Sequence, residues 1–264
     1  MYKIYKKCRM VIGDKLKTKN KQKVVYNKMN YVLDTHSHTI VSGHAYNTIN
    51  EMAMAASEKK LELLAITEHA PSMPGSCQEI YFRNLKVLER NKYGVELLFG
   101  AELNIIDKWG RVDLPNHVLE KLDIGIASLH PPCIKPGTME ENTAAYVNVM
   151  KNPYIDIIGH PDDDRFPIDY KILVETAKEQ NVLLEVNNSS IGHTDRKGAK
   201  EHILQMLKLC KEKNVSVVIG SDAHADTSVG NHGAAFALMK EVEFPEELVV
   251  NRSVNVLKSF LHKF

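Results

Sequence analysis

The stretch Tyr31-Val32-Leu33-Asp34-Thr35-His36-Ser37-His38 runs from a short apolar segment directly into two histidines. Side chains two positions apart on an extended chain point to the same side, so His36 and His38 can bind one metal ion together. A single His-x-His pair also arises by chance. The prediction of a metal site therefore depends on whether the pattern recurs along the chain.

The same pattern of an apolar run with a polar end recurs six more times. Each run is followed by a polar cluster and then by an amphipathic stretch, which predicts a strand, a loop and a helix. Two helix starts carry capping boxes, Thr48 with Glu51 and Thr138 with Glu141. The predicted strands are Tyr31–Leu33, Leu63–Thr67, Val95–Phe99, Leu122–Ala127, Tyr154–Ile158, Val182–Val186 and Val215–Ile219, and further helices are predicted over residues 78–91, 169–180, 198–213, 231–241 and 253–262.

The polar ends of the strands indicate how the sheet is arranged. Strands that alternate with helices pair in parallel, either in an open sheet or in a barrel. An open sheet binds its ligand mainly at one switch point, whereas a barrel brings the C-terminal ends of all its strands to one mouth. Polar side chains at every strand end therefore predict an α/β barrel of seven strands. These side chains are His36, His38, Glu68, His69, Glu102, His130, His160, Asn187, Asn188, Asp222 and His224.

Composition limits the class of protein further. The chain has 264 residues, of which 44% are hydrophobic, enough for one large core. Residues 1–30 carry ten basic side chains and one acidic side chain, whereas residues 31–264 carry 24 basic and 32 acidic ones, a net charge of −8. We therefore predict a basic N-terminal extension over 1–30, of which residues 1–28 are dispensable, and a single barrel domain over 31–264. The acidic domain argues against general nucleic-acid binding.

The cysteines and the apolar segments predict the cellular compartment. The four cysteines lie 55 or more residues apart, which is typical of reduced thiols rather than of a metal-binding or redox pair. The N-terminus has no apolar segment of the secretory kind, and no run of 18 apolar residues occurs. We therefore expect a cytoplasmic protein without a membrane contact. The oligomeric state is left open.

The histidines gather at the strand ends and just beyond them. Seven of the twelve lie there, and Glu102 and Asp222 add two carboxylates of the ligand type. A buried polar atom without a partner costs about 1–3 kcal/mol, and a metal ion is the partner that suits an imidazole best. Nine candidates exceed the needs of one zinc ion and suffice for two or three ions. The seven histidines are His36, His38, His44, His69, His130, His160 and His224.

The order of these motifs resembles that of the PHP (polymerase and histidinol phosphatase) superfamily, and more narrowly that of its compact bacterial phosphatases of the YcdX type. The resemblance runs from about residue 31 to the C-terminus. It implies a distorted (β/α)7, TIM-like barrel with a trinuclear metal centre at the C-terminal ends of the strands. The motifs are Asp34-Thr35-His36-Ser37-His38, His44, Thr67-Glu68-His69, Gly100-Ala101-Glu102, Ser128-Leu129-His130, Gly159-His160-Pro161, Glu185-Val186-Asn187-Asn188-Ser189-Ser190 and Gly220-Ser221-Asp222-Ala223-His224.

The resemblance also implies a role for each ligand. The three divalent ions are expected to be Zn, with Mn or Fe as alternatives. Glu68 departs from the family, which usually has Asp before His69, and we expect Glu68 to lie behind the ligands and to shift His69 without abolishing its metal binding. The implied ligands are His36, His38, Glu102 and Asp222 for one ion, Glu102, His130 and His160 for a second, and His44, His69 and His224 for the third.

The charge of such a centre predicts the substrate class. Three divalent ions leave a positive mouth, which favours a small phosphorylated substrate over a neutral one. We expect a metal-bridging hydroxide to hydrolyse a phosphate monoester, with Glu102 as the bridging ligand and Asp222 as the base for the water. The alternatives are a phosphodiesterase or another anionic-ester hydrolase on the same site, and a metal-binding regulatory protein without catalysis.

Further side chains are expected around the centre. Arg196 and Lys197 are interpreted either as a clamp for the substrate phosphate, as a similar pair in the family suggests, or as a solvated helix start. Asp34 is expected to orient a ligand histidine, and Glu185 is a candidate for burial beside the centre. His262 is expected at the surface.

Overall fold

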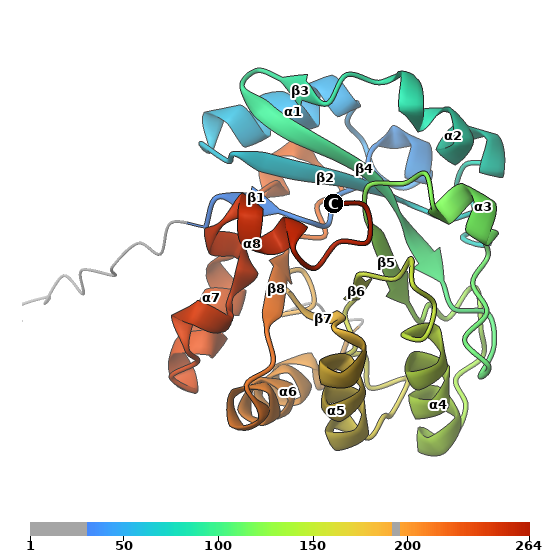
Figure 1. Cartoon of the computed structure of the whole chain (residues 1–264), viewed down its shortest axis with the longest axis vertical. Coiled ribbons are helices and arrows are strands. Elements are labelled where there is room, and N and C mark those ends of the chain that lie inside the picture. Colours follow the sequence, from blue (N-terminus) through green and yellow to red (C-terminus); the bar gives the residue numbers. More distant parts are fainter. Residues whose placement is uncertain (1–30, 192–195) are drawn as a thin grey trace, which may run out of the picture.

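The computed structural model describes residues 31–191 and 196–264, so the predicted extension over 1–30 lies outside the described residues. Parallel strands follow one another around the molecule in the order of the sequence, which confirms the predicted α/β barrel. Figure 1 shows these strands at the centre and the helices around them. The seven parallel strands of the described ranges are β1 Leu33–Asp34, β2 Leu63–His69, β4 Val95–Asn104, β5 Gly125–Ser128, β6 Ile157–Ile158, β7 Leu183–Asn187 and β8 Val217–Gly220.

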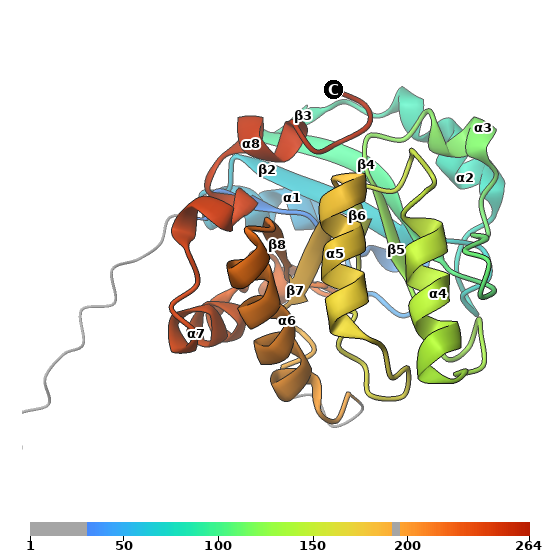
Figure 2. The ribbon, with the colours of Figure 1, turned by 60° about the horizontal axis from the view of Figure 1, so that its bottom comes forward.

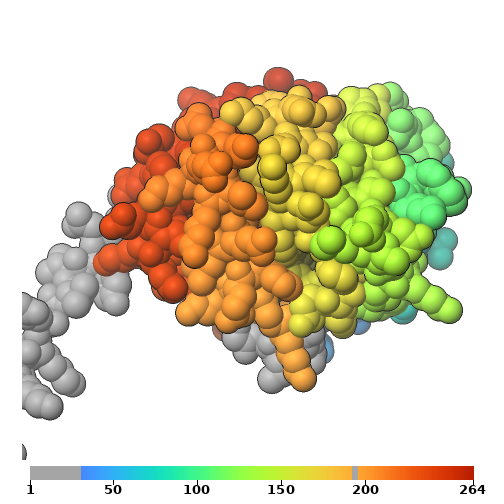
Figure 3. Space-filling model, turned by 90° about the horizontal axis from the view of Figure 1, so that it is seen from below, coloured from blue at the N-terminus to red at the C-terminus, as the bar shows by residue number. Residues whose placement is uncertain are grey.

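The helices cover the outside of the sheet. Figure 2 shows α4, α5 and α6 side by side in front of the strands, and Figure 3 shows the successive segments of the chain lying next to one another across this face. Both predicted capping boxes are present, at the starts of α1 and α4. Within the described ranges, no helix combines the length and the apolar character that a membrane crossing needs. The helices are α1 Ile49–Glu58, α2 Glu79–Asn84, α3 Asn116–Leu119, α4 Met139–Val149, α5 Tyr170–Gln180, α6 Ala199–Lys213, α7 Gly233–Glu241 and α8 Val254–Lys258.

The predicted helix over 78–91 is wrong in its second half. The helix α2 ends at Asn84, and a short strand, β3 Asn91–Lys92, pairs antiparallel with the start of β4. Tyr93 and Gly94 between the two strands have φ angles of 53° and 78°. Two positive φ angles at a two-residue connection are typical of a tight hairpin turn. The helical path ends before this hairpin, because a 3-10 turn over Leu85–Val87 leads into an extended backbone at Leu88.

The two faces of each strand serve different purposes. Along β2, Leu63 and Ala65 face the inside of the barrel, where they pack with residues of the other strands and with Leu257 of α8. Leu64 and Ile66 alternate with them and pack in the layer between the strands and the helices. Towards the C-terminal end of β2 the inner positions become polar, with His69 as the last residue. Polar side chains that could bind a ligand therefore gather at the C-terminal end of the barrel.

The barrel closes where β1 meets β8. Ser37 and Ala223 form a parallel bridge just beyond these strands, and the His38 N–H donates to the Ala223 carbonyl at 2.8 Å. At the opposite end of this seam the buried Asn251 side chain donates to the carbonyls of Leu33, at 3.1 Å, and Ile219, at 2.8 Å. One side-chain amide thus joins the first and the last strand of the barrel.

Candidate metal centre

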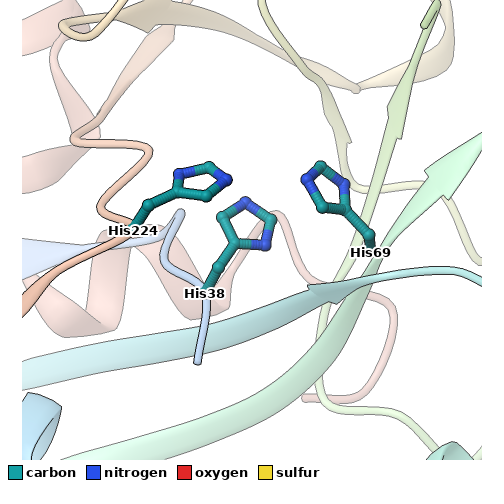
Figure 4. A group of neighbouring side chains, drawn as sticks. All are labelled: His38, His69 and His224. Atoms are coloured by element: carbon teal, nitrogen blue, oxygen red, sulfur yellow. The ribbon is translucent and has the colours of Figure 1, made fainter. Parts of the chain in front are cut away.

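The nine predicted ligands come together at the mouth. His69 and Glu102 lie on β2 and β4. The other ligands follow β1, β5, β6 and β8 within a few residues, except His44, which comes ten residues after β1. Figure 4 shows His38, His69 and His224 arriving from three different segments and facing a common space. Ring centroids are 4.2 Å apart for His38 and His69 and 4.4 Å apart for His38 and His224. The inner faces of distant strands thus supply one cluster.

The Glu102 carboxylate lies at the middle of this cluster. The side chain is buried, and both of its oxygens face imidazoles, which is the place expected for a ligand shared by two ions. The distances to Oε2 are 2.7 Å from His69 Nδ1, 3.4 Å from His36 Nε2 and 3.6 Å from His38 Nε2, and those to Oε1 are 2.7 Å from His160 Nε2 and 3.2 Å from His130 Nε2.

Asp222 forms the second acidic point of the cluster. Its Oδ1 lies 3.3 Å from His38 Nε2, 3.7 Å from His36 Nε2 and 3.5 Å from His224 Nδ1. Both Asp222 and His160 have positive φ angles, 51° and 27°. Such backbone conformations are uncommon in residues other than glycine and occur often at functional sites.

His44 stands at the outer side of the cluster. It is exposed, and its ring stacks on those of His69 and His224 with centroids 4.9 Å and 4.7 Å apart. Among the described residues, three sets of side chains bring one ligand atom each within 4.8 Å of one another, and one of these sets places His38 where the resemblance implied His44. The sets are His36, His38 and Asp222; His69, Glu102 and His130; and His38, His69 and His224.

Unpaired buried atoms test whether the cluster fits metal ions. Four imidazole nitrogens and one carboxylate oxygen face the interior without a hydrogen-bond partner, since their close contacts with one another lack hydrogen-bond geometry. Each such atom carries a desolvation cost of about 1–3 kcal/mol. Imidazole and carboxylate atoms are ligands for Zn, Mn and Fe, so this set fits a metal centre. The atoms are His36 Nε2, His38 Nε2, His69 Nδ1, His130 Nε2 and Glu102 Oε2.

Electrostatics favour ionised carboxylates in the cluster. Burial opposes ionisation of Glu102, but the neighbouring imidazoles, His130 foremost, hold its pKa well below the usual range. Burial likewise opposes ionisation of Asp222, and His36, His38 and Arg196 outweigh it and lower the pKa. Burial and the adjacent His69 lower the pKa of His38, so this ring is neutral and able to bind a metal ion.

Carboxylate and amide groups behind the ligands orient their rings. His36 Nδ1 lies 2.7 Å from Oε1 of Glu185, which is fully buried beside the centre as the sequence suggested. His130 Nδ1 lies 2.7 Å from Asn104 Oδ1. Sequence reasoning missed Asn104, although its position two residues after Glu102 on the same strand was an available signal. Such partners fix the ring orientation and the tautomer of a metal ligand.

Asp34 and Glu68 contact the ligand residues through the backbone rather than through the imidazole rings. Asp34 accepts hydrogen bonds from the backbone N–H groups of Ser221, at 3.0 Å, Gly230, at 2.7 Å, and the ligand residue His36, at 3.4 Å. Glu68 lies behind the ligands as expected, but its carboxylate bonds the segment after β1 instead of the His69 ring.

The two basic candidates separate in the structure. Arg196 donates to Ser190 Oγ at 2.7 Å, and its Nη2 lies 3.7 Å from Asp222 Oδ2. Lys197 is exposed on the turn before α6. Only Arg196 therefore adjoins the cluster in the described part of the chain.

Comparisons with known proteins agree with this geometry. The model of the PHP domain family matches residues 34–217. The chain is 47% identical over 233 residues to a probable phosphatase of Clostridium novyi (strain NT), a match that covers 88% of this chain and 95% of the relative.

Two solved structures share the fold. One is the histidinol phosphate phosphatase of Lactococcus lactis subsp. lactis in complex with Zn, L-histidinol and phosphate, at 18% identity, a TM-score of 0.57, and coverage of 81% of this chain and 95% of that one. The other is a chain in the structure of archaeal ribonuclease P with mature tRNA, at 18% identity, a TM-score of 0.55, and coverage of 86% and 90%. At this identity both matches show the fold alone.

Proposed function

The chain belongs to the PHP domain family, and on this premise we propose that it is a metal-dependent phosphatase that hydrolyses phosphate monoesters. The observation that carries the proposal is the set of five buried, unpaired ligand atoms that face one another at the mouth. The name of the Clostridium relative, a probable phosphatase, supports the reaction class. The zinc, L-histidinol and phosphate in the Lactococcus structure support zinc as the ion and a small phosphorylated substrate.

All nine clustered residues are proposed as ligands of three divalent ions. The unpaired nitrogens of His36 and His38 and the low pKa of Asp222 suit the first ion, and Glu102 would be shared with the second. Divalent ions, when bound, activate water and neutralise charge on the phosphoryl group. The proposed ligands are His36, His38, Glu102 and Asp222 for the first ion, Glu102, His130 and His160 for the second, and His44, His69 and His224 for the third.

The side chains around the ligands have separate tasks. Asp222 is proposed to accept the proton of the attacking water, because its carboxylate lies among the ligand rings, 3.3 Å from His38 Nε2 and 3.7 Å from His36 Nε2. We propose that the Arg196 guanidinium binds the phosphoryl oxygens through two parallel hydrogen bonds, and its position 3.7 Å from Asp222 Oδ2 supports this role. A monoester dianion offers this group and the ions more negative charge than a diester does, which favours the monoester.

Metal analysis and turnover test the proposal together. We expect the purified protein to hold two to three Zn, Mn or Fe ions, and to hydrolyse p-nitrophenyl phosphate faster than bis-p-nitrophenyl phosphate. A metal content near zero after gentle purification would refute the metal centre. Bound metal with no hydrolysis of either ester would favour the regulatory protein, and faster hydrolysis of the diester would favour the phosphodiesterase.

Glu102→Gln tests the shared ligand. The variant keeps the shape of the side chain but removes the charge that two ions would share, so we expect kcat to fall by about 10²-fold or more and the metal content to drop. Glu120→Gln, at an exposed position, is the matched control and should leave both unchanged. Full activity of Glu102→Gln would show that Glu102 is not the shared ligand.

A further inference from the structure

Glu68 is a buried carboxylate beside the ligands that the proposed reaction does not use. It precedes His69 on β2, is 1% exposed, and its Oε2 accepts from the Thr39 N–H at 3.0 Å and from Ser42 Oγ at 2.6 Å. Its Oε1 accepts from Thr39 Oγ1 and, at 3.5 Å, from the Tyr81 hydroxyl. All of these partners are donors, so both carboxylate oxygens act as acceptors. The glutamate therefore reaches from β2 to the segment that joins His38 to His44.

Ser42 connects this carboxylate to a ligand ring. The hydroxyl has a single proton, and the short contact with Glu68 places that proton on the carboxylate side. The remaining lone pairs of Ser42 Oγ accept from the His69 backbone N–H at 3.0 Å and face His38 Nδ1 at 3.2 Å. Because Ser42 already donates its only proton to Glu68, His38 Nδ1 must be the donor in the contact between His38 and Ser42 Oγ. The proton of the neutral His38 ring then resides on Nδ1.

The other nitrogen of His38 is left with its lone pair exposed to the cluster. His38 Nε2 has no hydrogen-bond partner and lies 3.3 Å from Asp222 Oδ1 and 3.6 Å from Glu102 Oε2. We infer that Glu68 is a positioning residue, which acts through Ser42 to hold His38 in the Nδ1–H tautomer and to present Nε2 to the metal ions. The inference rests on the proposed function, because it assumes that His38 is a ligand. His36 Nδ1 makes a comparable contact with a carboxylate directly, 2.7 Å from Glu185 Oε1.

Glu68→Met tests this relay while keeping most of the bulk of the side chain. The thioether offers Ser42 Oγ no strong acceptor, which frees the serine proton for His38 Nδ1 and releases the tautomer. The readouts are the ¹⁵N NMR signals of the His38 ring in metal-free protein at pH 8 and the affinity for Zn²⁺ in competition with a chelator. We expect wild-type protein to show the Nδ1–H tautomer, and the variant to lose this preference and to bind Zn²⁺ about 10- to 100-fold more weakly. Tyr81→Phe is the matched control, since its hydroxyl contacts Glu68 outside the relay, and it should change neither readout.

Ser42→Ala gives a second and independent measurement. Removing the hydroxyl should weaken Zn²⁺ binding to a similar degree, and the double variant should bind within about twofold of the weaker single variant, because both changes break one connection. Losses that multiply in the double variant would overturn the relay, as would a wild-type His38 with its proton on Nε2. Failure of the proposed function would look different: the tautomer result would stand, while wild-type protein would show no metal-dependent hydrolysis.

Discussion

Arg196 keeps its charge in a largely buried position. The side chain is 19% exposed, and burial by itself would lower its pKa. The carboxylates around it, Asp222 first and Asp162 next, outweigh burial and raise the pKa above the ordinary value. Arg196 Nη1 donates a hydrogen bond to Ser190 Oγ at 2.7 Å, which fixes the orientation of the guanidinium. A permanent and oriented cation thus stands beside the proposed ligands.

Arg196→Lys is therefore expected to weaken substrate binding. Lysine keeps the charge but cannot form two parallel hydrogen bonds, so we predict that kcat/KM for p-nitrophenyl phosphate falls about tenfold or more. Lys197→Ala, one residue away and exposed, should change kcat/KM by less than about twofold. Equal and small effects of both substitutions would instead favour the solvated helix start.

At the scale of elements, the close packing of β7, β8 and the segment after β1 shapes the centre. Gly220 is the last residue of β8, and a Cβ atom there would lie 1.9 Å from Glu185 Oε1 and 2.8 Å from His36 Cβ. A larger residue would therefore displace the carboxylate that orients His36. Because Gly220 has no side chain, Glu185 of β7 and His36 after β1 can come into contact beside it.

Gly220→Ala is predicted to lower the free energy of unfolding by about 1–3 kcal/mol, because the added methyl group overpacks a rigid interior. Urea unfolding of the metal-free protein measures the change. Gly233→Ala in α7 is the control, since the nearest neighbour of its Cβ outside the helix backbone would be Asn231 Oδ1 at 3.8 Å, and it should be neutral or slightly stabilising. Equal effects at both sites would contradict the packing argument.

The chain after α8 is held to the base of the barrel by an ion pair. His262, predicted at the surface, is instead largely buried, with Nδ1 3.0 Å from Asp156 Oδ2. The prediction was wrong because Asp156 lies 106 residues away in the sequence. Burial opposes protonation of His262, but Asp156 outweighs it and raises the pKa.

This pair makes stability depend on pH. Since the folded pKa of His262 lies above its unfolded value of about 6.5, the contribution is complete below that pH and is lost as the pH rises through the folded pKa. We predict that His262→Gln lowers the free energy of unfolding by about 1 kcal/mol at pH 5.5 and by less at pH 9. Urea unfolding at the two pH values measures the difference, and a difference that grows with pH would contradict the assignment.

At the scale of the whole molecule, Asn251 closes the barrel. Besides its two donated bonds, its Oδ1 accepts from the Ile219 N–H at 2.7 Å, and the Val32 N–H donates to its carbonyl at 2.9 Å. The residue is fully buried. It therefore supplies, from outside the sheet, hydrogen bonds that a continuous ladder between β1 and β8 would otherwise make.

Asn251→Ala should destabilise the whole fold. The substitution leaves three buried backbone groups without partners, and we expect the free energy of unfolding to fall by about 3 kcal/mol or more. Thermal or urea unfolding measures this, with Asn255→Ala on exposed α8 surface as the control that stays near wild type. A loss below about 1 kcal/mol would show that the seam does not depend on this side chain.

The sequence by itself determined the strand order and the capping boxes, because hydrophobic periodicity and helix capping are local properties. It also determined the gathering of nine candidate ligands, because parallel strands in a barrel bring their C-terminal ends together. Only the tertiary structure decided which groups stand behind those ligands. Glu185 meets His36 across 149 residues, and Asn251 meets Leu33 across 218. No local spacing encodes such contacts, since they arise when the barrel closes and places the inner faces of distant strands a few ångströms apart.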